Sequence, residues 1–375
     1  HNKKEEKMKR LRRKKITTFS LLLILIIGLI ITPQQNVLAD SNQGTGLIES
    51  KFGDYTTGSG SWTPTDGVFI EEDYFGYWQG YNSHLYVHYT TNGEVAYHND
   101  FSDGTGRAMD SDGHNIYFTT ATDPAPLYKL NTTTWTYTSV DLSVSGQGAA
   151  LCYYDGKIYV GTKTGNFEVF NKDTLQSLDT YTPGGPNNMP DLYVDDDYLY
   201  YHTYGNTLYK VNLETSSTTS TTIGTKLSSI SGNGHNLVLS DTSSQYHIVN
   251  KTTLDTVYTK TGIGETWSTA ADPLGLYFYI TDRDGYIRVW NDTAEQEEQA
   301  YSLGWSDLTN GMKVSAESQK LILRDNSQKA TVLNLEGYIG PSPPVPEKST
   351  LMLFSIGLIM VISYIIYKKR KKVHM

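Results

Sequence analysis

Short runs of apolar and β-branched residues alternate with polar turn sequences along most of the chain, and residues 147–183 show the pattern most clearly. Within this stretch four such runs are separated by the turn sequences Asp155-Gly156, Thr164-Gly165-Asn166 and Asn171-Lys172-Asp173-Thr174. The first two are typical of tight hairpin turns, and the third is typical of a four-residue turn opened by an Asn side chain. The stretch therefore predicts one four-stranded antiparallel meander of about forty residues.

This meander recurs along the chain at a nearly constant spacing. Its best marker is an Asn that closes the third apolar run, and a degenerate first copy places Tyr89 at the same point. The six Asn markers are Asn131, Asn171, Asn212, Asn250, Asn291 and Asn334. From Tyr89 onward the successive steps are 42, 40, 41, 38, 41 and 43 residues. Seven units of four strands predict an all-β fold, a seven-bladed β-propeller; an open solenoid is the competing repeat architecture, but it needs polar caps that the sequence lacks.

Two turns bound the second and third strands of each unit. The side-chain oxygen of the marker Asn can accept hydrogen bonds from backbone N–H groups two residues further on, which fixes the later turn. An earlier turn signal stands 16 to 19 residues upstream, for example Asp112-Gly113 or Asn233-Gly234. The strand after it reads with two-residue alternation, as in Ile116-Tyr117-Phe118.

The two ends of the repeat series predict closure of the ring. The last copy stops after its third strand, near residues 337–341, and lacks a fourth. A spare strand-like segment, residues 47–55, precedes the first copy. We expect this N-terminal segment to pair as the outer strand of the last blade, which closes the propeller without an exposed sheet edge.

Residues 155–174 read Asp-Gly-Lys-Ile-Tyr-Val-Gly-Thr-x-x-Gly-Asn-x-x-Val-x-Asn-x-x-Thr. This pattern resembles the quinoprotein-type (PQQ-like) propeller repeat and is similar to the surface-layer propellers of archaea and bacteria. The resemblance covers residues 45–340 and implies the propeller fold. It does not imply quinone catalysis, because the regularly placed Trp and Gly residues of those enzymes are absent and Cys152 is the single cysteine.

The termini predict export and membrane anchoring. Residues 1–39 combine a basic region, a short apolar core and small residues before a cleavage point, as a signal peptide does; a retained anchor is the alternative. Residues 40–340 form the propeller ectodomain, and residues 341–350 are a proline-rich spacer. Residues 351–367 are apolar enough for a transmembrane helix, and the basic tail 368–375 places its end in the cytoplasm.

The C-terminal segment also resembles a PEP-CTERM sorting signal. It reads Val345-Pro346-Glu347-Lys348-Ser349-Thr350, followed by the apolar stretch and the basic cluster. Lys348 stands where the motif has Pro. The resemblance implies a processed surface protein, and a plain membrane anchor is the alternative. We expect a single-pass protein of the cell membrane with an extracellular ectodomain.

Charge and cysteine content narrow the classes of partner. The chain has a formal net charge of −9, but fourteen of its 31 Lys and Arg residues lie in the two termini. Residues 40–349 therefore carry a formal charge of −21. A domain this acidic does not bind nucleic acid by charge, and a single cysteine excludes a disulfide framework.

Aromatic residues suggest a ligand platform. Trp62, Trp267 and Trp305 each begin the first strand of a unit, in blades that become neighbours once the ring closes. Trp78 and Tyr81 fall on the same predicted face, and Asp325 lies nearby. Flat apolar rings with a few oriented polar groups suit a carbohydrate or a protein ligand, whereas packing between blades is the alternative role for these residues.

Other residues are candidates for metal binding or modification. A carboxylate pair such as Asp282 and Asp284 most often forms a simple turn, and we expect no cofactor; Ca²⁺, to which these two residues could offer carboxylates, is the one possibility. Asp195-Asp196-Asp197 and Glu71-Glu72-Asp73 admit the same two interpretations. His84, His88 and His98 lie on one predicted hairpin, but strand alternation is expected to prevent all three from sharing a face. Three sequons for glycosylation begin at Asn131, Asn250 and Asn291; selection of Asn and Thr by the turn itself is the alternative origin of these sequences.

The sequence predicts a binding or scaffold module at the cell surface, with a surface protein or polysaccharide as partner. No Gly-x-Ser-x-Gly, His-Glu-x-x-His or phosphate-binding glycine loop is present. Two alternatives stay open. One is an extracellular polysaccharide hydrolase or lyase, whose paired carboxylates cannot be excluded by sequence spacing. The other is a structural component of a surface layer.

Overall fold

The computed structural model describes residues 48–56, 64–70, 73–79, 84–101, 104–183, 189, 191–272, 275–304, 308–314, 320–325 and 329–335. Within these residues the chain is all-β, with four-stranded antiparallel sheets and no helix, and it fits a β-propeller-like fold. No helix of this part of the chain is long and apolar enough to cross a membrane. The predicted signal peptide, residues 1–39, and the predicted transmembrane helix, residues 351–367, lie outside the described residues.

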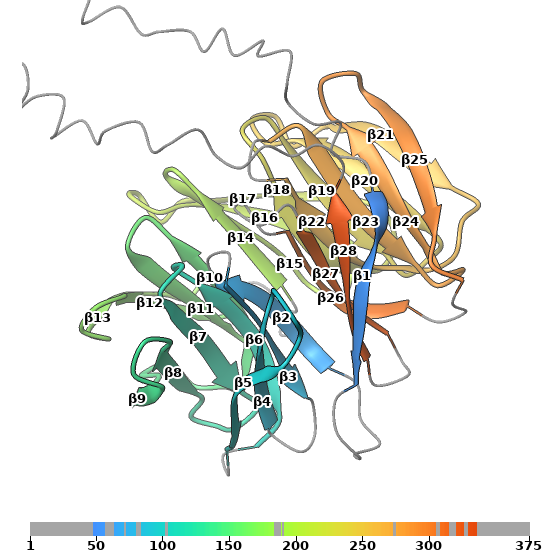
Figure 1. The fold of residues 1–375 in the computed structure, drawn as a ribbon. Helices are drawn as coiled ribbons and strands as arrows, with labels where there is room; N and C mark the ends of the chain where they lie inside the picture. Colours follow the sequence, from blue (N-terminus) through green and yellow to red (C-terminus); the bar gives the residue numbers. More distant parts are fainter. Residues whose placement is uncertain are drawn as a thin grey trace, which may run out of the picture. The chain divides into compact units, whose positions relative to one another are not determined.

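Six of the sheets each consist of four strands that follow one another in sequence, in the order in which they pair (Figure 1). The first three are β2 (Pro64–Ile70), β3 (Tyr74–Gln79), β4 (His84–Tyr89) and β5 (Val95–Asp100); β6 (Gly106–Ser111), β7 (Asn115–Thr120), β8 (Pro126–Asn131) and β9 (Thr136–Asp141); and β10 (Gly148–Tyr154), β11 (Lys157–Thr162), β12 (Phe167–Asn171) and β13 (Ser177–Tyr181). The next three are β14 (Asp191–Asp195), β15 (Tyr198–His202), β16 (Thr207–Asn212) and β17 (Thr218–Thr222); β18 (Leu227–Gly232), β19 (Asn236–Asp241), β20 (Gln245–Asn250) and β21 (Thr256–Thr261); and β22 (Thr266–Ala271), β23 (Tyr277–Asp282), β24 (Tyr286–Asn291) and β25 (Gln296–Ser302). The predicted four-stranded meander is thus confirmed as the repeating unit.

A further four-stranded sheet joins the two ends of the repeat series. It contains β26 (Leu308–Val314), β27 (Lys320–Asp325) and β28 (Lys329–Leu335), and its outer strand is β1 (Ile48–Thr56). The pairing of β1 with β28 is antiparallel and runs from Ile48 opposite Leu335 to Thr56 opposite Lys329. The expected partner of the N-terminal segment is therefore the observed one.

The first strands of the sheets contact one another in sequence order. β6 contacts β2 and β10, β14 contacts β10 and β18, and β22 contacts β18 and β26. β26 in turn contacts β2. Each sheet consequently packs face to face on its neighbours, and the apolar clusters lie between adjacent sheets.

Burial falls from the second strand of a sheet to its fourth. Every residue of β7 and of β19 is buried, whereas β9 and β17 are mostly exposed. The expectation of simple alternation in the second strand is corrected here, because both faces of that strand pack against neighbouring sheets. The fourth strand lies at the outside, and its Thr- and Ser-rich sequence agrees with that position.

The marker Asn residues form the turns that their sequence predicts. Asn171 Oδ1 accepts from the N–H groups of Asp173 at 2.9 Å and Thr174 at 3.0 Å. The corresponding bonds recur at Asn131, Asn212, Asn250 and Asn291. A local side-chain acceptor therefore sets the turn between the third and fourth strands in five of the sheets.

Aspartates on the first strands link neighbouring sheets. Asp66 Oδ2 accepts from the N–H of Met109 at 2.8 Å, and Asp110 Oδ2 accepts from the N–H of Tyr153 at 2.8 Å. Asp191 Oδ2 likewise accepts from Ile230 N–H at 3.1 Å. Adjacent first strands are not paired by backbone hydrogen bonds, so these side chains satisfy N–H groups that face the next sheet. Sequence reasoning did not identify them.

Candidate functional site

The turn between the first and second strands of a sheet recurs at the same end of several neighbouring sheets, and a single pocket lies at these turns. Asp155 and Gly156 in this turn have φ angles of 44° and 74°, as a type I′ hairpin turn requires. In the following sheets the equivalent turns begin at Asp196, Asn233 and Asp272. The repeat thus places short polar side chains at the same end of consecutive sheets.

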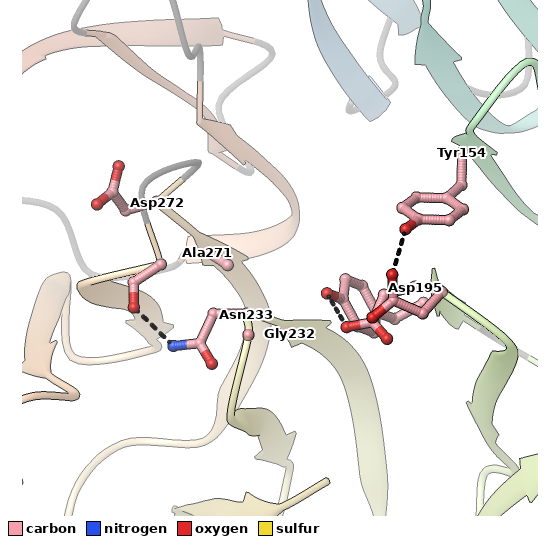
Figure 2. A pocket seen from close by; sticks show the side chains of 10 residues that line it. Tyr154, Asp195, Gly232, Asn233, Ala271 and Asp272 are labelled. Atoms are coloured by element: carbon pink, nitrogen blue, oxygen red, sulfur yellow. Dashed lines mark hydrogen bonds between the residues drawn. The ribbon is translucent and has the colours of Figure 1, made fainter. Parts of the chain in front are cut away.

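The pocket has a volume of about 390 Å³ (Figure 2). Tyr154 and Asp195 lie on one side of it, and Asn233 and Asp272 lie on the other (Figure 2). Its lining residues are Tyr154, Tyr193, Asp195, Asp196, Gly232, Asn233, Gly234, Ala271, Asp272 and Gly275. Four sheets contribute to it, so the pocket depends on the arrangement of the repeats and not on any single turn.

Hydrogen bonds orient the tyrosines and carboxylates of the pocket. Tyr193 donates its hydroxyl to Asp195 Oδ2 at 3.1 Å, and Tyr154 donates to Asp196 Oδ1 at 3.0 Å. Burial, followed by the Asp195 carboxylate, raises the pKa of Tyr193. Burial is also the main reason that the pKa of Tyr154 is raised. Both phenols therefore stay protonated at neutral pH and act as donors to the carboxylates.

One carboxylate of the pocket already has a cationic partner. Lys251 forms an ion pair with Asp195 Oδ2, and the side chains of the two residues are only 10% and 13% exposed. Lys251 follows the marker Asn250. A similar ion pair between neighbouring sheets joins Lys172, which follows Asn171, to Asp112 at 3.2 Å. Asp196 is exposed and remains the acidic group most open to a ligand.

The opposite wall is fixed by amide hydrogen bonds. Asn233 Nδ2 donates to the carbonyl of Gly275 at 3.0 Å and to Asp292 Oδ2 at 2.9 Å. Gly232 lies against the ring of Tyr193, and a Cβ at residue 232 would come within 2.4 Å of that ring. The pocket shape consequently depends on the absence of a side chain at Gly232.

The predicted aromatic platform needs correction at Trp78. This side chain is 1% exposed and packs between two sheets, with its ring 4.8 Å from that of Phe118 and 5.3 Å from that of Phe101. It is a core residue and is not accessible to a ligand. The alternation of β3 directs Trp78 toward the next sheet, whereas its neighbour Tyr77 packs on the other side.

Trp267 is the one other predicted platform residue whose side chain the structure describes. It is half-buried, donates from Nε1 to Glu265 Oε2 at 3.2 Å, and has the Arg283 guanidinium 5.7 Å from its ring centre. Trp267 is the second residue of β22, and the pocket residue Ala271 ends that strand about 13 Å away. Trp62, Tyr81 and Trp305 lie outside the described residues, as does the side chain of Asp325.

The two carboxylates considered as Ca²⁺ ligands differ in environment. Asp282 is fully buried and its Oδ2 accepts from Arg288 Nε at 2.8 Å, whereas Asp284 is exposed. Burial, partly offset by the Tyr286 N–H and by Arg288, raises the pKa of Asp282. A cation at Asp282 would have to displace Arg288, so this pair offers one free carboxylate at most.

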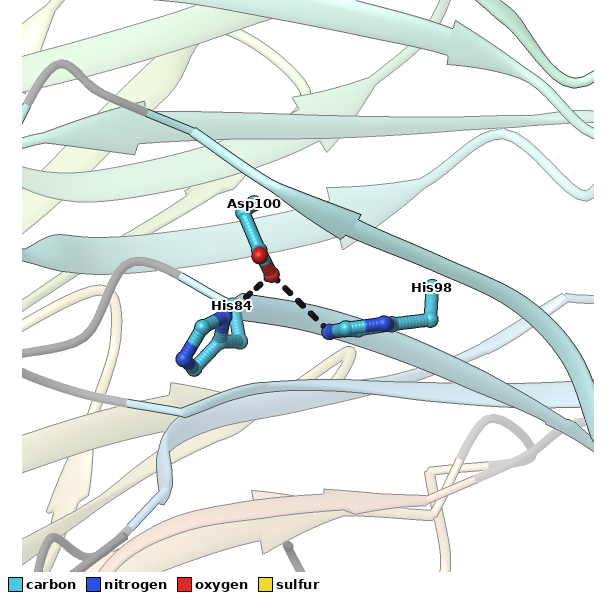
Figure 3. A group of neighbouring side chains, drawn as sticks. All are labelled: His84, His98 and Asp100. Carbon is cyan, nitrogen blue, oxygen red and sulfur yellow. Dashed lines mark hydrogen bonds and ion pairs between the residues drawn. The ribbon is translucent and has the colours of Figure 1, made fainter.

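The histidines of the β4–β5 hairpin lie on one face of their sheet, contrary to the sequence expectation. Tyr86 stacks on both His88 and His98, and its edge contacts His84. His88 is buried and bonded to Tyr77 Oη at 3.0 Å and to the Gly93 carbonyl at 2.8 Å. His84 and His98 instead meet Asp100, which sequence analysis missed (Figure 3). The hairpin register, with His84 opposite Asp100, is the signal that could have identified it.

Comparisons with known proteins do not assign a family. No protein-family model matches the chain, and no curated protein matches its sequence significantly.

Proposed function

We propose that this chain is a cell-surface, membrane-anchored β-propeller of seven blades that acts as a carbohydrate-binding module. Closure of the ring is supported by the contacts between successive first strands, including that of β26 with β2. It is also supported by the antiparallel pairing of β1 with β28, since β1 comes from the other end of the chain and supplies the fourth strand of the last sheet. A closed propeller leaves only short, protected sheet edges.

The location of the protein is proposed from its termini. A basic and apolar N-terminal segment, a C-terminal apolar stretch of residues 351–367 and a basic tail favour an exported ectodomain on a single-pass anchor. Fractionation of cells that express the full chain or a chain ending at residue 345 tests this proposal. We expect the full chain in the membrane fraction, accessible to protease added outside, and the shorter chain released. Full protection from external protease would reject the surface location.

The observation that carries the ligand proposal is the pocket at the turns of four neighbouring sheets. Its volume of about 390 Å³ suits one or two sugar rings. The exposed carboxylate of Asp196 can accept from sugar hydroxyls, and the phenols of Tyr154 and Tyr193 add aromatic surface beside it; Asp272, which is buried, shapes the opposite wall. Asn233 is already oriented by its bonds to Gly275 and Asp292. A ring with several hydroxyls matches this set better than an anion does, because the pocket is acidic.

A glycan array probed with the detergent-solubilised full chain tests the ligand proposal, with product release monitored alongside retention. Asp196→Asn keeps an acceptor for Tyr154 and tolerates the φ of 44° at this position, but it removes the charge. We expect this variant to lose binding by about tenfold or more, which corresponds to a hydrogen bond to a charged group.

Trp267→Ala, at the other end of β22, is the matched control. We expect it to retain binding. If Trp267→Ala abolishes retention while Asp196→Asn does not, the aromatic platform is the site and the pocket is not. Cleavage of a glycan would favour the hydrolase or lyase alternative. If no glycan on the array is retained and the protein forms ordered assemblies, a surface-layer component is favoured.

A further inference from the structure

We propose that His84, His98 and Asp100 form a binding site for a divalent transition-metal ion, with Zn²⁺ the best match to the ligands. The site lies on the β2–β5 sheet and is independent of the carbohydrate pocket. Two imidazoles and one carboxylate would supply three protein ligands, and a water molecule or a partner's donor group would take the fourth position.

The hairpin register brings the three side chains together. β4 and β5 pair antiparallel with His84 opposite Asp100 and with Tyr86 opposite His98. Because directly opposed residues point to the same face and alternate residues share it, His84, His98 and Asp100 project from one side of the sheet. Figure 3 shows the Asp100 carboxylate directed at both imidazoles.

The donor atoms are already nearly as close as a metal ion requires. They all lie within 4.8 Å of one another, and His98 Nε2 is 3.0 Å from Asp100 Oδ1. His84 Nδ1 contacts the same carboxylate oxygen. Bonds of about 2.0–2.1 Å in a tetrahedral Zn²⁺ site place its ligand atoms about 3.3 Å apart, so small side-chain rotations are sufficient.

The ligand types select among metals. Ca²⁺ and Mg²⁺ prefer sets made of oxygen atoms, whereas imidazole nitrogen suits Zn²⁺ and its neighbours in the first transition series. A set of two His and one carboxylate therefore favours Zn²⁺ over Ca²⁺ at this cluster. In this respect the hairpin cluster differs from the exposed acidic turns of the molecule.

Stacked aromatic rings hold the imidazoles in place. Tyr86 stacks on His98 with ring centres 4.3 Å apart and an angle of 14°, and it stacks on Tyr77 at 5.6 Å. Tyr77 is buried and bonded to His88, so the stack is anchored in the core. Fixing the ring of a ligand before the metal arrives lowers the entropic cost of binding.

Solvent reaches the cluster. The side chains of His84, His98 and Asp100 are 25%, 39% and 65% exposed, respectively. An ion held there can exchange with the medium and keep one position open. A surface site of this kind suits a partner that contributes a further carboxylate or imidazole.

Isothermal titration of ZnCl₂ into the tag-free full chain in detergent tests the proposal. We expect one strong site that is weakened at least about tenfold by His98→Gln and by Asp100→Asn, since each substitution removes a ligand. His114→Gln, a change of an exposed histidine on another sheet, is the matched control and is expected to bind Zn²⁺ as the wild type does. CaCl₂ in place of ZnCl₂ is expected to give no heat that depends on His98.

Co²⁺ substitution provides a second measurement on the unaltered chain, which guards against variants that fail to fold. A visible absorption spectrum of four-coordinate Co²⁺, displaced by one equivalent of Zn²⁺, supports the site. Equal Zn²⁺ affinity of the wild type, His98→Gln and Asp100→Asn overturns it, and so does the absence of such a Co²⁺ spectrum. The cluster would then be two imidazoles that share one carboxylate.

Discussion

The indole of Trp78 lies directly against the backbone of Gly106, so closely that a Cβ at residue 106 would come within 1.7 Å of the indole Nε1. The two residues belong to adjacent sheets, in β3 and β6. The large ring is buried because the first strand of the next sheet has no side chain at this point. A small residue opposite a large one allows the two sheets to approach closely.

We therefore expect Gly106→Ala to destabilise the fold by about 1–3 kcal/mol, because the added methyl group forces the indole or a strand to move. Urea unfolding followed by tryptophan fluorescence measures this loss. Gly234→Ala is the control, because a Cβ there would meet no atom within 4 Å. Equal destabilisation by the two substitutions would mean that the contact with Trp78 does not explain the effect.

The repeating unit could be predicted from sequence because its signals are local. Asn171 and Thr174 lie within one turn, and their hydrogen bonds need no distant partner. The same holds for Asp155 and Gly156, whose positive φ angles follow from the residue types. The turn positions therefore fixed the order and pairing of the strands within a sheet.

The side chains that are buried between neighbouring sheets could not be predicted from such local signals. Trp78 and Trp267 both stand near predicted strand ends, yet one is buried and the other is half-exposed. The difference depends on Gly106 opposite Trp78, a residue from another repeat. Likewise the pocket combines turns from four sheets, and Asp100 joins the histidines only through cross-strand register. Contacts between segments that are distant in sequence determine the burial of these Trp side chains, the pocket and the His–Asp cluster. The periodicity of the sequence carries no information about such contacts.

The turn at Asn171 predicts a specific requirement for a side-chain acceptor. We expect Asn171→Ala to destabilise the protein by about 1 kcal/mol, because two backbone N–H groups lose their acceptor. Asn171→Asp retains the oxygen and is the matched control, with a much smaller expected loss. Thermal unfolding monitored by circular dichroism measures both variants. Similar losses for Ala and Asp would show that the amide nitrogen, and not the accepting oxygen, stabilises this turn.

Asp241 predicts a loss of stability in acid. Its carboxylate is fully buried, which by itself raises the pKa, but His247 and the N–H groups of Thr225 and Ser243 hold the pKa well below its usual range. A carboxyl whose pKa is lower in the folded state stabilises the fold above the unfolded-state pKa of about 3.9, and this contribution is lost as the pH falls toward the folded-state pKa.

We expect Asp241→Asn to cost about 2–3 kcal/mol at pH 7 and distinctly less at pH 3, where the unfolded wild-type chain is protonated. Urea unfolding of the two proteins across this pH range measures the difference. Asp255→Asn, at an exposed carboxylate, is the control and is expected to show no such dependence. A cost that stays constant from pH 7 to pH 3 would contradict the ionised state of Asp241 in the fold.

The ion pair of Lys251 with Asp195 predicts strong coupling between two neighbouring sheets. Both side chains are largely buried, so Lys251→Met leaves the Asp195 carboxylate without its cation and is expected to destabilise the fold by about 3 kcal/mol. Adding Asp195→Asn removes the unpaired charge while Tyr193 can still donate to residue 195. We therefore expect the double variant to be more stable than Lys251→Met alone. A double-mutant cycle from urea unfolding gives the coupling energy, and strictly additive losses would mean that the pair contributes no interaction of its own.

Since Asp195 also lines the pocket, glycan binding by the double variant reports whether this carboxylate or its neighbour Asp196 contacts the ligand.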